Sequence, residues 1–133
     1  MAQVRADDSA ASKRAKAAFL RLRPYALDPT IVGCPYKAAD KPRTSYPSGH
    51  ATMVFAAATV LSDLAPNRAQ DMMRYATGYA HDRLVCGHHY QSDVVAGQVL
   101  GTVVGEELLH SPALKGDIDA ARAELLAARI AAQ

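Results

Sequence analysis

Residues 47–64 read PSGHATMVFAAATVLSDL, and this stretch decides the fold that we expect. Its apolar part, residues 51–64, is longer than most strands and has the length of a buried helix. Ser48 stands just before it, and serine is a preferred residue at a helix N-cap. The stretch therefore predicts a buried helix that begins directly after Ser48.

Proline and glycine residues divide the rest of the chain into further helices. Before the central stretch, residues 8–22 are rich in Ala, Lys, Arg and Leu, and Pro24 should stop this helix near Arg23. Pro66 opens a helix after it, and Gly87 and Pro112 mark further breaks. With no convincing strand, the chain is predicted to be an all-α helical bundle forming one domain, 1–133. The predicted helices are 8–22, 51–64, 67 to about 81, 89 to about 110, and 118–130.

A long irregular segment is predicted between the first two helices. Residues 24–47 contain several prolines and Gly33, and no apolar period is sustained across them. Long segments without secondary structure are uncommon in compact domains and usually carry a function. We therefore expect part of the functional site to come from this segment.

Composition limits the classes of partner. The formal net charge is +2, too small to indicate nucleic acid or a membrane surface as the main partner. The longest apolar runs are shorter than the roughly 18 residues of a spanning helix. Residues 1–16 lack the apolar centre of a secretory signal, so we expect an export peptide to be absent or already removed. Cys34 and Cys86 are compatible with two unpaired thiols or with one disulfide.

Two polar clusters lie at the edges of the first two predicted helices. Lys16 and Arg23 are seven residues apart, which on one helix places both cations on the same face. Gly49 and His50 follow Ser48 at the start of the central helix, where free backbone N–H groups favour an anion. Ser48 can donate a hydroxyl, and His50 carries a proton that titrates near pH 6.5. Both clusters are suited to binding an oxyanion.

The third cluster, residues 82–93, is the densest in ionisable groups. If a helix begins near His89, Asp93 lies one turn later and can hold one imidazole nitrogen, leaving the other as a nucleophile. Arg83 would supply a bidentate fork for phosphate oxygens. A metal site is the competing interpretation, although the spacing matches no common zinc pattern. Its candidate ligands are His81, Asp82, Cys86, His88, His89 and Asp93.

In chain order, these clusters resemble a known signature. Six residues separate Lys16 from Arg23-Pro24, and residues 47–50 (PSGH) follow. Five residues then separate Arg83 from His89, and three separate His89 from Asp93. This pattern resembles the vanadium haloperoxidase and type 2 phosphatidic acid phosphatase superfamily. The residues that flank the motifs are similar to those of the class A bacterial non-specific acid phosphatases. The resemblance covers about residues 16–110.

The resemblance implies a metal-independent acid phosphatase that hydrolyses phosphate monoesters through a phosphohistidine intermediate, with no cofactor. It implies His89 as the nucleophile, His50 as the general acid and Asp93 as the orienting partner of His89. It also implies a periplasmic or secreted protein inhibited by inorganic phosphate or vanadate. A bell-shaped pH profile on the acid side of neutrality is expected. The residues implied to bind phosphate are Lys16, Arg23, Ser48, Gly49 and Arg83.

Two features depart from the family pattern. Asp82 stands where the family usually has serine, and it is expected either to weaken phosphate binding or to point at Arg83. The family fold also has more helices before the first motif, so the chain is interpreted as a fragment, a processed product or a shortened variant. Exposed apolar surface should then drive homo-oligomerisation. The alternatives are a non-catalytic phosphate-binding remnant and a vanadium-dependent haloperoxidase with the same site.

Overall fold

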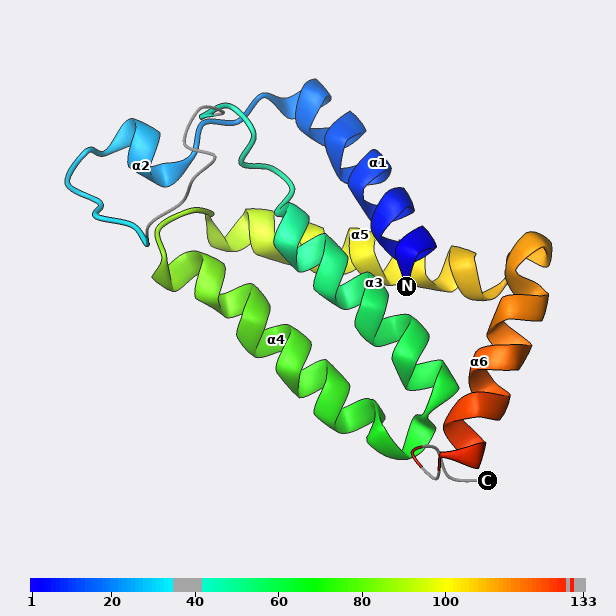
Figure 1. The fold of residues 1–133 in the computed structure, drawn as a ribbon. Helices are drawn as coiled ribbons and strands as arrows, with labels where there is room; N and C mark the ends of the chain where they lie inside the picture. Colours follow the sequence, from blue (N-terminus) through cyan, green and yellow to red (C-terminus); the bar gives the residue numbers. More distant parts are fainter. Residues whose placement is uncertain (35–41, 129, 131–133) are drawn as a thin grey trace.

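The computed structural model describes residues 1–34, 42–128 and 130, and these residues form helices joined by turns and loops. No strand occurs among them, which confirms the all-α prediction. Figure 1 shows the order of the elements. They are α1 (Ala2–Phe19), α2 (Pro24–Leu27), α3 (Gly49–Leu64), η1 (Pro66–Arg68), α4 (Ala69–Val85), α5 (Gln91–Leu109), η2 (Pro112–Leu114) and α6 (Lys115–Ala127).

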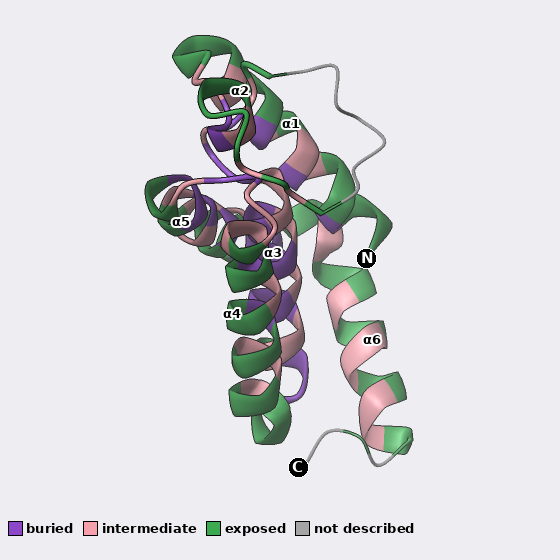
Figure 2. Ribbon diagram, turned by 90° about the vertical axis from the view of Figure 1, so that its left-hand side faces the viewer, coloured by how far each residue is buried: buried purple, intermediate pink, exposed green. Residues whose placement is uncertain are grey.

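Helix α3 is the centre of the molecule, as its apolar sequence predicts. It packs against α5 most extensively, and against α4, α1 and α6 as well. Buried residues are concentrated on α3, while the outer faces of α4 and α6 are largely exposed (Figure 2). The predicted N-cap is confirmed, because Ser48 Oγ accepts a hydrogen bond from the Ala51 N–H. The core residues of α3 are Ala51, Val54, Ala56, Ala58, Val60 and Leu64.

Three glycines bring α5 unusually close to α3. A Cβ atom at Gly97 would lie 2.6 Å from the Ser48 carbonyl oxygen, and one at Gly105 would lie 2.7 Å from the Thr59 Cβ. A Cβ at Gly101 would overlap the Thr52 carbonyl oxygen. The glycines recur every four residues and so share one face of the helix. The α5 backbone therefore lies directly against α3 along this face, in contact with its main chain and with the side chains of Ala51, Phe55 and Thr59.

The bounds of the first helix differ from the prediction. Helix α1 begins at Ala2 rather than Asp8, because Val4 packs against the core residues Ala56 and Val60 and so makes the first turn part of the fold. It ends at Phe19 rather than Leu22. Beyond it, the Ser45 N–H donates to the Arg21 carbonyl and the Arg23 N–H to the Pro42 carbonyl. Residues 21–23 therefore pair with the loop instead of continuing the helix.

The later helices also shift by a few residues. Helix α4 continues to Val85, and the chain turns at Gly87, whose φ of +64° favours glycine. Helix α5 begins at Gln91 instead of His89, because the Asp93 carboxylate accepts the Tyr90 N–H and fixes the start of the helix there. Helix α6 begins at Lys115, earlier than the predicted residue 118, and ends at Ala127.

The segment between α1 and α3 is irregular apart from the single turn of α2, which starts at Pro24. Residues 35–41 of this predicted segment lie outside the described residues. A disulfide joins Cys34 to Cys86, which resolves the two alternatives for these cysteines. In the described part of the chain, every helix is too short or too polar to cross a membrane.

Candidate active site

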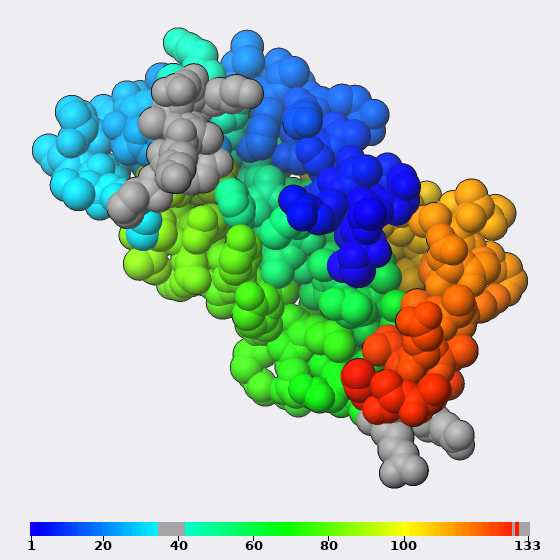
Figure 3. Space-filling model, in the orientation of Figure 1, coloured from blue at the N-terminus to red at the C-terminus, as the bar shows by residue number. Residues whose placement is uncertain are grey.

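A cavity of about 580 Å³ lies along α1, between this helix and the first turns of α3. In the space-filling view, α1 (blue) lies against α3 (teal to green) on the face shown (Figure 3). Five of the eight residues that the sequence analysis selected line this one cavity, although they come from separate parts of the chain. They are Lys16, Arg23, Gly49, His50 and His89.

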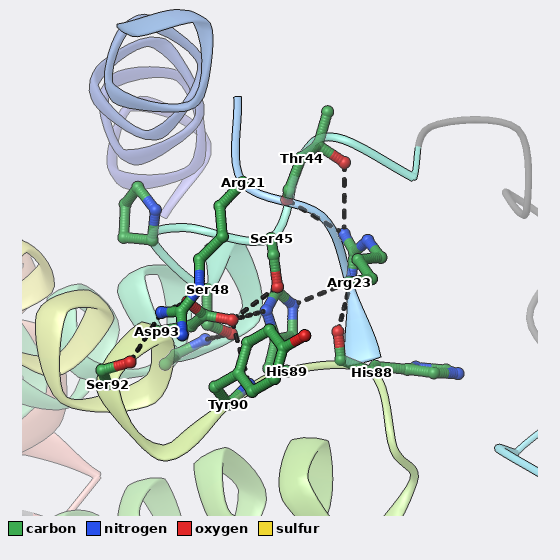
Figure 4. Close-up of polar contacts among 12 residues, drawn as sticks. Arg21, Arg23, Thr44, Ser45, Ser48, His88, His89, Tyr90, Ser92 and Asp93 are labelled. Carbon is green, nitrogen blue, oxygen red and sulfur yellow. Dashed lines mark hydrogen bonds and ion pairs between the residues drawn. The ribbon is translucent and has the colours of Figure 1, made fainter. Parts of the chain in front are cut away.

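His89 lies just before α5 and is held between an anion and a cation (Figure 4). Its Nδ1 is 3.3 Å from Oδ2 of Asp93, and its Nε2 is 3.1 Å from Nη1 of Arg23. A guanidinium only donates hydrogen bonds, so Nε2 must be the acceptor and Nδ1 must carry the proton. His89 is therefore a neutral imidazole whose Nε2 lone pair is on the side of the cavity cations.

Burial lowers the pKa of His89 against the opposing hydrogen bond and charge of Asp93, and together with the positive charges of Arg23 and Lys16 it brings this pKa to about 4. The ring is almost completely buried, and the charged form is disfavoured in such surroundings. His89 consequently stays neutral across most of the acid pH range. A neutral imidazole is the form that can act as a nucleophile.

Asp93 is the most heavily hydrogen-bonded group of the site. Its Oδ2 accepts from Ser45 Oγ at 2.5 Å and from the Tyr90 N–H at 2.9 Å, in addition to the His89 contact. Its Oδ1 accepts from Nη1 of Arg21 at 2.8 Å. Burial alone would raise the pKa of this carboxyl, but the hydrogen bonds and the Arg21 charge outweigh burial and lower it. Asp93 is therefore a fixed anion.

Arg23 is not on the same helix face as Lys16, which corrects the sequence expectation. It lies beyond the end of α1, at the N-cap of α2, and the loop pairing described above directs its side chain into the cavity. Nη1 donates to the His88 carbonyl at 2.9 Å, and Nη2 is 3.3 Å from the Thr44 carbonyl. The guanidinium is thus fixed beside Nε2 of His89.

Lys16 reaches the same cavity from the last turn of α1. Its Nζ donates to the Thr44 carbonyl at 2.6 Å and to the Pro47 carbonyl at 2.5 Å. Burial and the nearby Arg23 charge lower its pKa to about 8, so it remains protonated in acid solution. The loop carbonyls therefore orient a second cation next to the start of α3.

His50 occupies the first turn of α3, beside Gly49. Burial lowers its pKa, and the charges of Arg83, Arg23, His88 and Lys16 lower it further. Its ring centroid is 6.2 Å from that of Tyr79 on α4. His50 and His89 thus line one cavity from different elements, which is the arrangement that acid and nucleophile require.

The cavity lining excludes Asp93, described above, and also Ser48, Arg83 and Asp82. Ser48 is fully buried, and its N–H donates to the Asp93 carbonyl at 2.9 Å, which ties the start of α3 to the start of α5. Arg83 lies over the Tyr79 ring at 5.4 Å, and its Nε is buried without a hydrogen-bond partner among the described residues. Asp82 is exposed on α4 and forms no ion pair with Arg83 in the described structure.

Sequence reasoning missed the residues that hold the site together, namely Arg21, Thr44 and Ser45. Thr44 acts mainly through its carbonyl oxygen, with a longer contact of 3.4 Å from its Oγ1 to Nη2 of Arg23, so its side chain gives little signal. Arg21 and Arg23 are two residues apart, which places them on one side of an extended segment. That spacing would have indicated Arg21 if residues 21–23 had been interpreted as extended.

The described residues contain no group of three or more His, Cys, Asp and Glu side chains placed to hold a metal ion. The candidate ligands of the metal interpretation are accordingly dispersed. His89 and Asp93 face each other, Cys86 is in the disulfide, and His88 Nε2 is 3.0 Å from the Cys34 carbonyl oxygen. Asp82 is exposed, as is His81.

The fold and the site together define an all-helical protein with a histidine and carboxylate pair in a cationic cavity. Residues 8–115 match the PAP2 superfamily, and the chain belongs to this superfamily. This result confirms the resemblance that the three motifs indicated.

Curated relatives carry acid phosphatase names. The chain is 31% identical over 116 residues to a non-specific acid phosphatase of Providencia stuartii, covering 86% of this chain and 46% of that protein. It is 35% identical over 116 residues, with the same coverage, to a non-specific acid phosphatase of Salmonella typhimurium. An acid phosphatase of Zymomonas mobilis is 39% identical over 90 residues, 66% of this chain and 33% of that protein. The chain thus spans about half the length of the first two relatives.

Proposed function

We propose that the chain is a metal-independent acid phosphatase that hydrolyses phosphate monoesters through a phosphohistidine intermediate. The observation that carries this proposal is the pairing of His89 with Asp93 on one side and Arg23 on the other, in a cavity that His50 also lines. The acid phosphatase names of the relatives support the same reaction.

The phosphate group of the substrate binds beside Lys16, Arg23 and the backbone N–H groups at the start of α3. Arg23 already donates to Nε2 of His89, so phosphate oxygens that draw Arg23 toward them release the lone pair for attack. The missing side chain of Gly49 keeps the space beside Ser12 and Lys16 open, since a Cβ there would lie 3.2 Å from the Ser12 Oγ and 3.7 Å from the Lys16 Cε. Ser48 supports the phosphate site as the N-cap of α3. Arg83, whose positive charge already acts on His50, is assigned to the phosphate through that charge.

In the first step, Nε2 of His89 attacks phosphorus in line with the ester oxygen, and the P–O bond breaks. The electron pair leaves with the ester oxygen, which takes a proton from protonated His50. Asp93 stabilises the positive charge that develops on the His89 ring through the Nδ1–H hydrogen bond. The cations neutralise the charge of the transferring phosphoryl group, as in other phosphoryl transfers.

In the second step, neutral His50 removes a proton from water while the water oxygen attacks phosphorus. The P–N bond breaks, its electron pair returns to Nε2, and inorganic phosphate is released. The cycle restores neutral His89 and protonated His50. No electron acceptor or further reactant is required.

Hydrolysis of 4-nitrophenyl phosphate at pH 5, with and without a chelator, tests this function. We expect turnover that is unchanged by chelator, abolished in His89→Ala, and inhibited by vanadate and inorganic phosphate. Acid quenching of the wild-type chain with ³²P-labelled substrate should trap label on protein that His89→Ala does not trap. Phosphate binding without turnover would contradict the proposal and identify a non-catalytic remnant, and a requirement for added zinc would contradict metal independence.

Location and assembly are part of the same proposal. The Cys34–Cys86 disulfide supports a periplasmic or secreted protein, because disulfides persist in oxidising compartments. Self-association is supported by an exposed apolar stripe on α5, formed by Val95, Val99 and Val103, which are 44%, 62% and 52% exposed. Apolar stripes of this kind often mark contacts between proteins.

A further inference from the structure

The cavity is larger than a phosphate group requires. Its volume of about 580 Å³ falls within the range of roughly 300–1,000 Å³ of pockets that hold a complete small-molecule ligand. The residues proposed to bind phosphate occupy only the end near Lys16 and His89. The rest of the lining must face the other part of the substrate, which is its leaving group.

The remaining lining follows α1 away from the phosphate end. Arg5, Asp8, Ser12 and Lys16 recur every three or four residues, so they share one face of the helix. Helices α1 and α3 run in opposite directions, because Lys16 is close to Gly49 whereas Val4 packs against Ala56. Ser12 faces the first turn of α3, where a Cβ on Gly49 would lie 3.2 Å from its Oγ. Asp8 follows one turn further, about 12 Å along the helix from Lys16.

Asp8 and Ser12 are unusual for a surface helix, because each residue is only 4% exposed. Among the described residues, Asp8 forms no ion pair. A buried carboxyl group without a cationic partner costs free energy unless hydrogen bonds satisfy it. Burial raises the pKa of Asp8, and the Ser9 backbone N–H and the Arg5 charge only partly oppose this shift. The carboxyl oxygens can accept hydrogen bonds from a hydroxyl partner, and the protonated form can also donate one.

The charge of the cavity distinguishes between classes of leaving group. Four cations line it against the single carboxyl of Asp8, so a cationic amine on the substrate would be repelled. Hydroxyl groups carry no charge and suit the polar side chains of Asp8, Ser9 and Ser12. The lining cations are Arg5, Lys13, Lys16 and Arg23.

We propose that the leaving group of the substrate lies along this face of α1, and that Asp8 and Ser12 bind its hydroxyl groups, which favours phosphate monoesters of sugars and polyols. The proposal rests on the proposed phosphatase function. It assigns to Asp8 a specificity-determining role. It also places the scissile oxygen toward His50, which lines the same cavity and is the proposed proton donor.

The test compares two substrates in wild type and Asp8→Ala. Glycerol 1-phosphate carries free hydroxyls, and 4-nitrophenyl phosphate carries none. We expect kcat/KM for glycerol 1-phosphate to fall by about tenfold, the effect of losing one strong hydrogen bond, with 4-nitrophenyl phosphate changing by less than about twofold. The inhibition constant of inorganic phosphate should stay within about twofold, since phosphate occupies only the other end.

Asp7→Ala is the matched control, because Asp7 is the adjacent carboxylate but bonds Gln3 outside the cavity. It should alter neither substrate. If Asp8→Ala does not fold, Asp8→Asn keeps the shape of the side chain and should change the substrate ratio in the same direction by a smaller factor.

Equal losses on both substrates, or no loss on glycerol 1-phosphate, would overturn the assignment of Asp8. A steeper loss on phosphoethanolamine than on glycerol 1-phosphate would also overturn it, because Asp8 would then bind a cation. A wild-type chain that hydrolyses none of these substrates would instead refute the phosphatase function itself.

Discussion

Nη1 of Arg21 lies 2.8 Å from Oδ1 of Asp93, so a partly exposed arginine holds a carboxylate that has no exposed surface. The same Nη1 donates to Ser92 Oγ at 2.6 Å, and the guanidinium carbon lies 4.1 Å from the centroid of the Tyr90 ring. Because Oδ2 of Asp93 is used by Ser45, Tyr90 and His89, Arg21 determines how the other oxygen is held. Arg21 is thus a positioning residue for His89, acting through Asp93.

Replacing Arg21 should therefore impair the chemical step rather than substrate binding. In Arg21→Met, we expect kcat to fall by about 10- to 100-fold with little change in KM, because one hydrogen bond to a charged group is lost. The Arg21 charge lowers the pKa of Asp93, so its removal raises that pKa. Protonation of Asp93 then adds to protonation of His89 at the acid limb of the pH profile, which moves to higher pH. Arg14→Met, an exposed residue of α1, is the control. An unshifted acid limb would show that Arg21 has only a structural role.

The pH dependence of kcat/KM should be bell-shaped and lie below neutrality. The acid limb belongs to His89, whose pKa of about 4 means that the nucleophile is neutral above that pH. The alkaline limb belongs to His50, which must be protonated. Burial and the charges of Arg83, Arg23, His88 and Lys16 lower its pKa below 6.5. Initial rates from pH 3 to 9 measure both limbs, and a maximum above pH 7 would contradict these assignments.

Arg23→Ala should change the pH profile as well as weaken the binding of anions. The Arg23 charge lowers the pKa of His89, so removing this charge raises that pKa and moves the acid limb to higher pH. The same change should weaken inhibition by vanadate by at least about tenfold, since one cation is lost. Vanadate titration at several pH values measures both effects. Arg74→Ala on α4, which bonds only Asp71 on its own helix, should change neither.

The contact between α3 and α5 can be tested with two glycine substitutions. In Gly101→Ala, the new Cβ would overlap the Thr52 carbonyl oxygen, and we expect the free energy of unfolding to fall by about 2–3 kcal/mol. In Gly78→Ala, the new Cβ has no atom within 4 Å, and the free energy of unfolding should rise by about 0.5–1 kcal/mol. Urea denaturation compares the two. Similar stabilities for both variants would refute the close packing of the helices.

Self-association through α5 predicts a mass that depends on protein concentration. Sedimentation equilibrium should show dimers or larger species in the wild type, and Val99→Lys should shift the population to monomers. Burying a lysine in an apolar contact is unfavourable because the charge loses its hydration. Val32→Lys is the matched control, since Val32 is 95% exposed and lies far from α5 in sequence. A monomeric wild type at all concentrations would contradict the proposal.

The central helix and the fold class were predictable because their signals are local. Ser48 caps α3 as its position indicated, and the apolar residues that follow it form the core. The convergence of Lys16, Arg23, His50 and His89 was also predicted, from ordered motifs rather than from local preferences. The cavity brings these residues together.

What could not be predicted depends on contacts between distant segments. Residues 20–22 have good helical preference, yet the backbone of residues 21–23 pairs with Pro42 and Ser45, which sequence preference does not show. The start of α1 at Ala2 follows from the packing of Val4 on α3. The contribution of Thr44 comes mainly from a backbone carbonyl, so its amino-acid type carried little information.

The glycine face of α5 has one more consequence. His50 lies in the first turn of one of the two helices that touch there, and His89 lies just before the other, so the close approach of α3 and α5 helps to set how far apart the two imidazoles are held. A larger residue at any of the three glycines would push the two helices apart, and the two rings with them. Substitutions at these positions are therefore expected to change the geometry of the cavity as well as the stability of the fold.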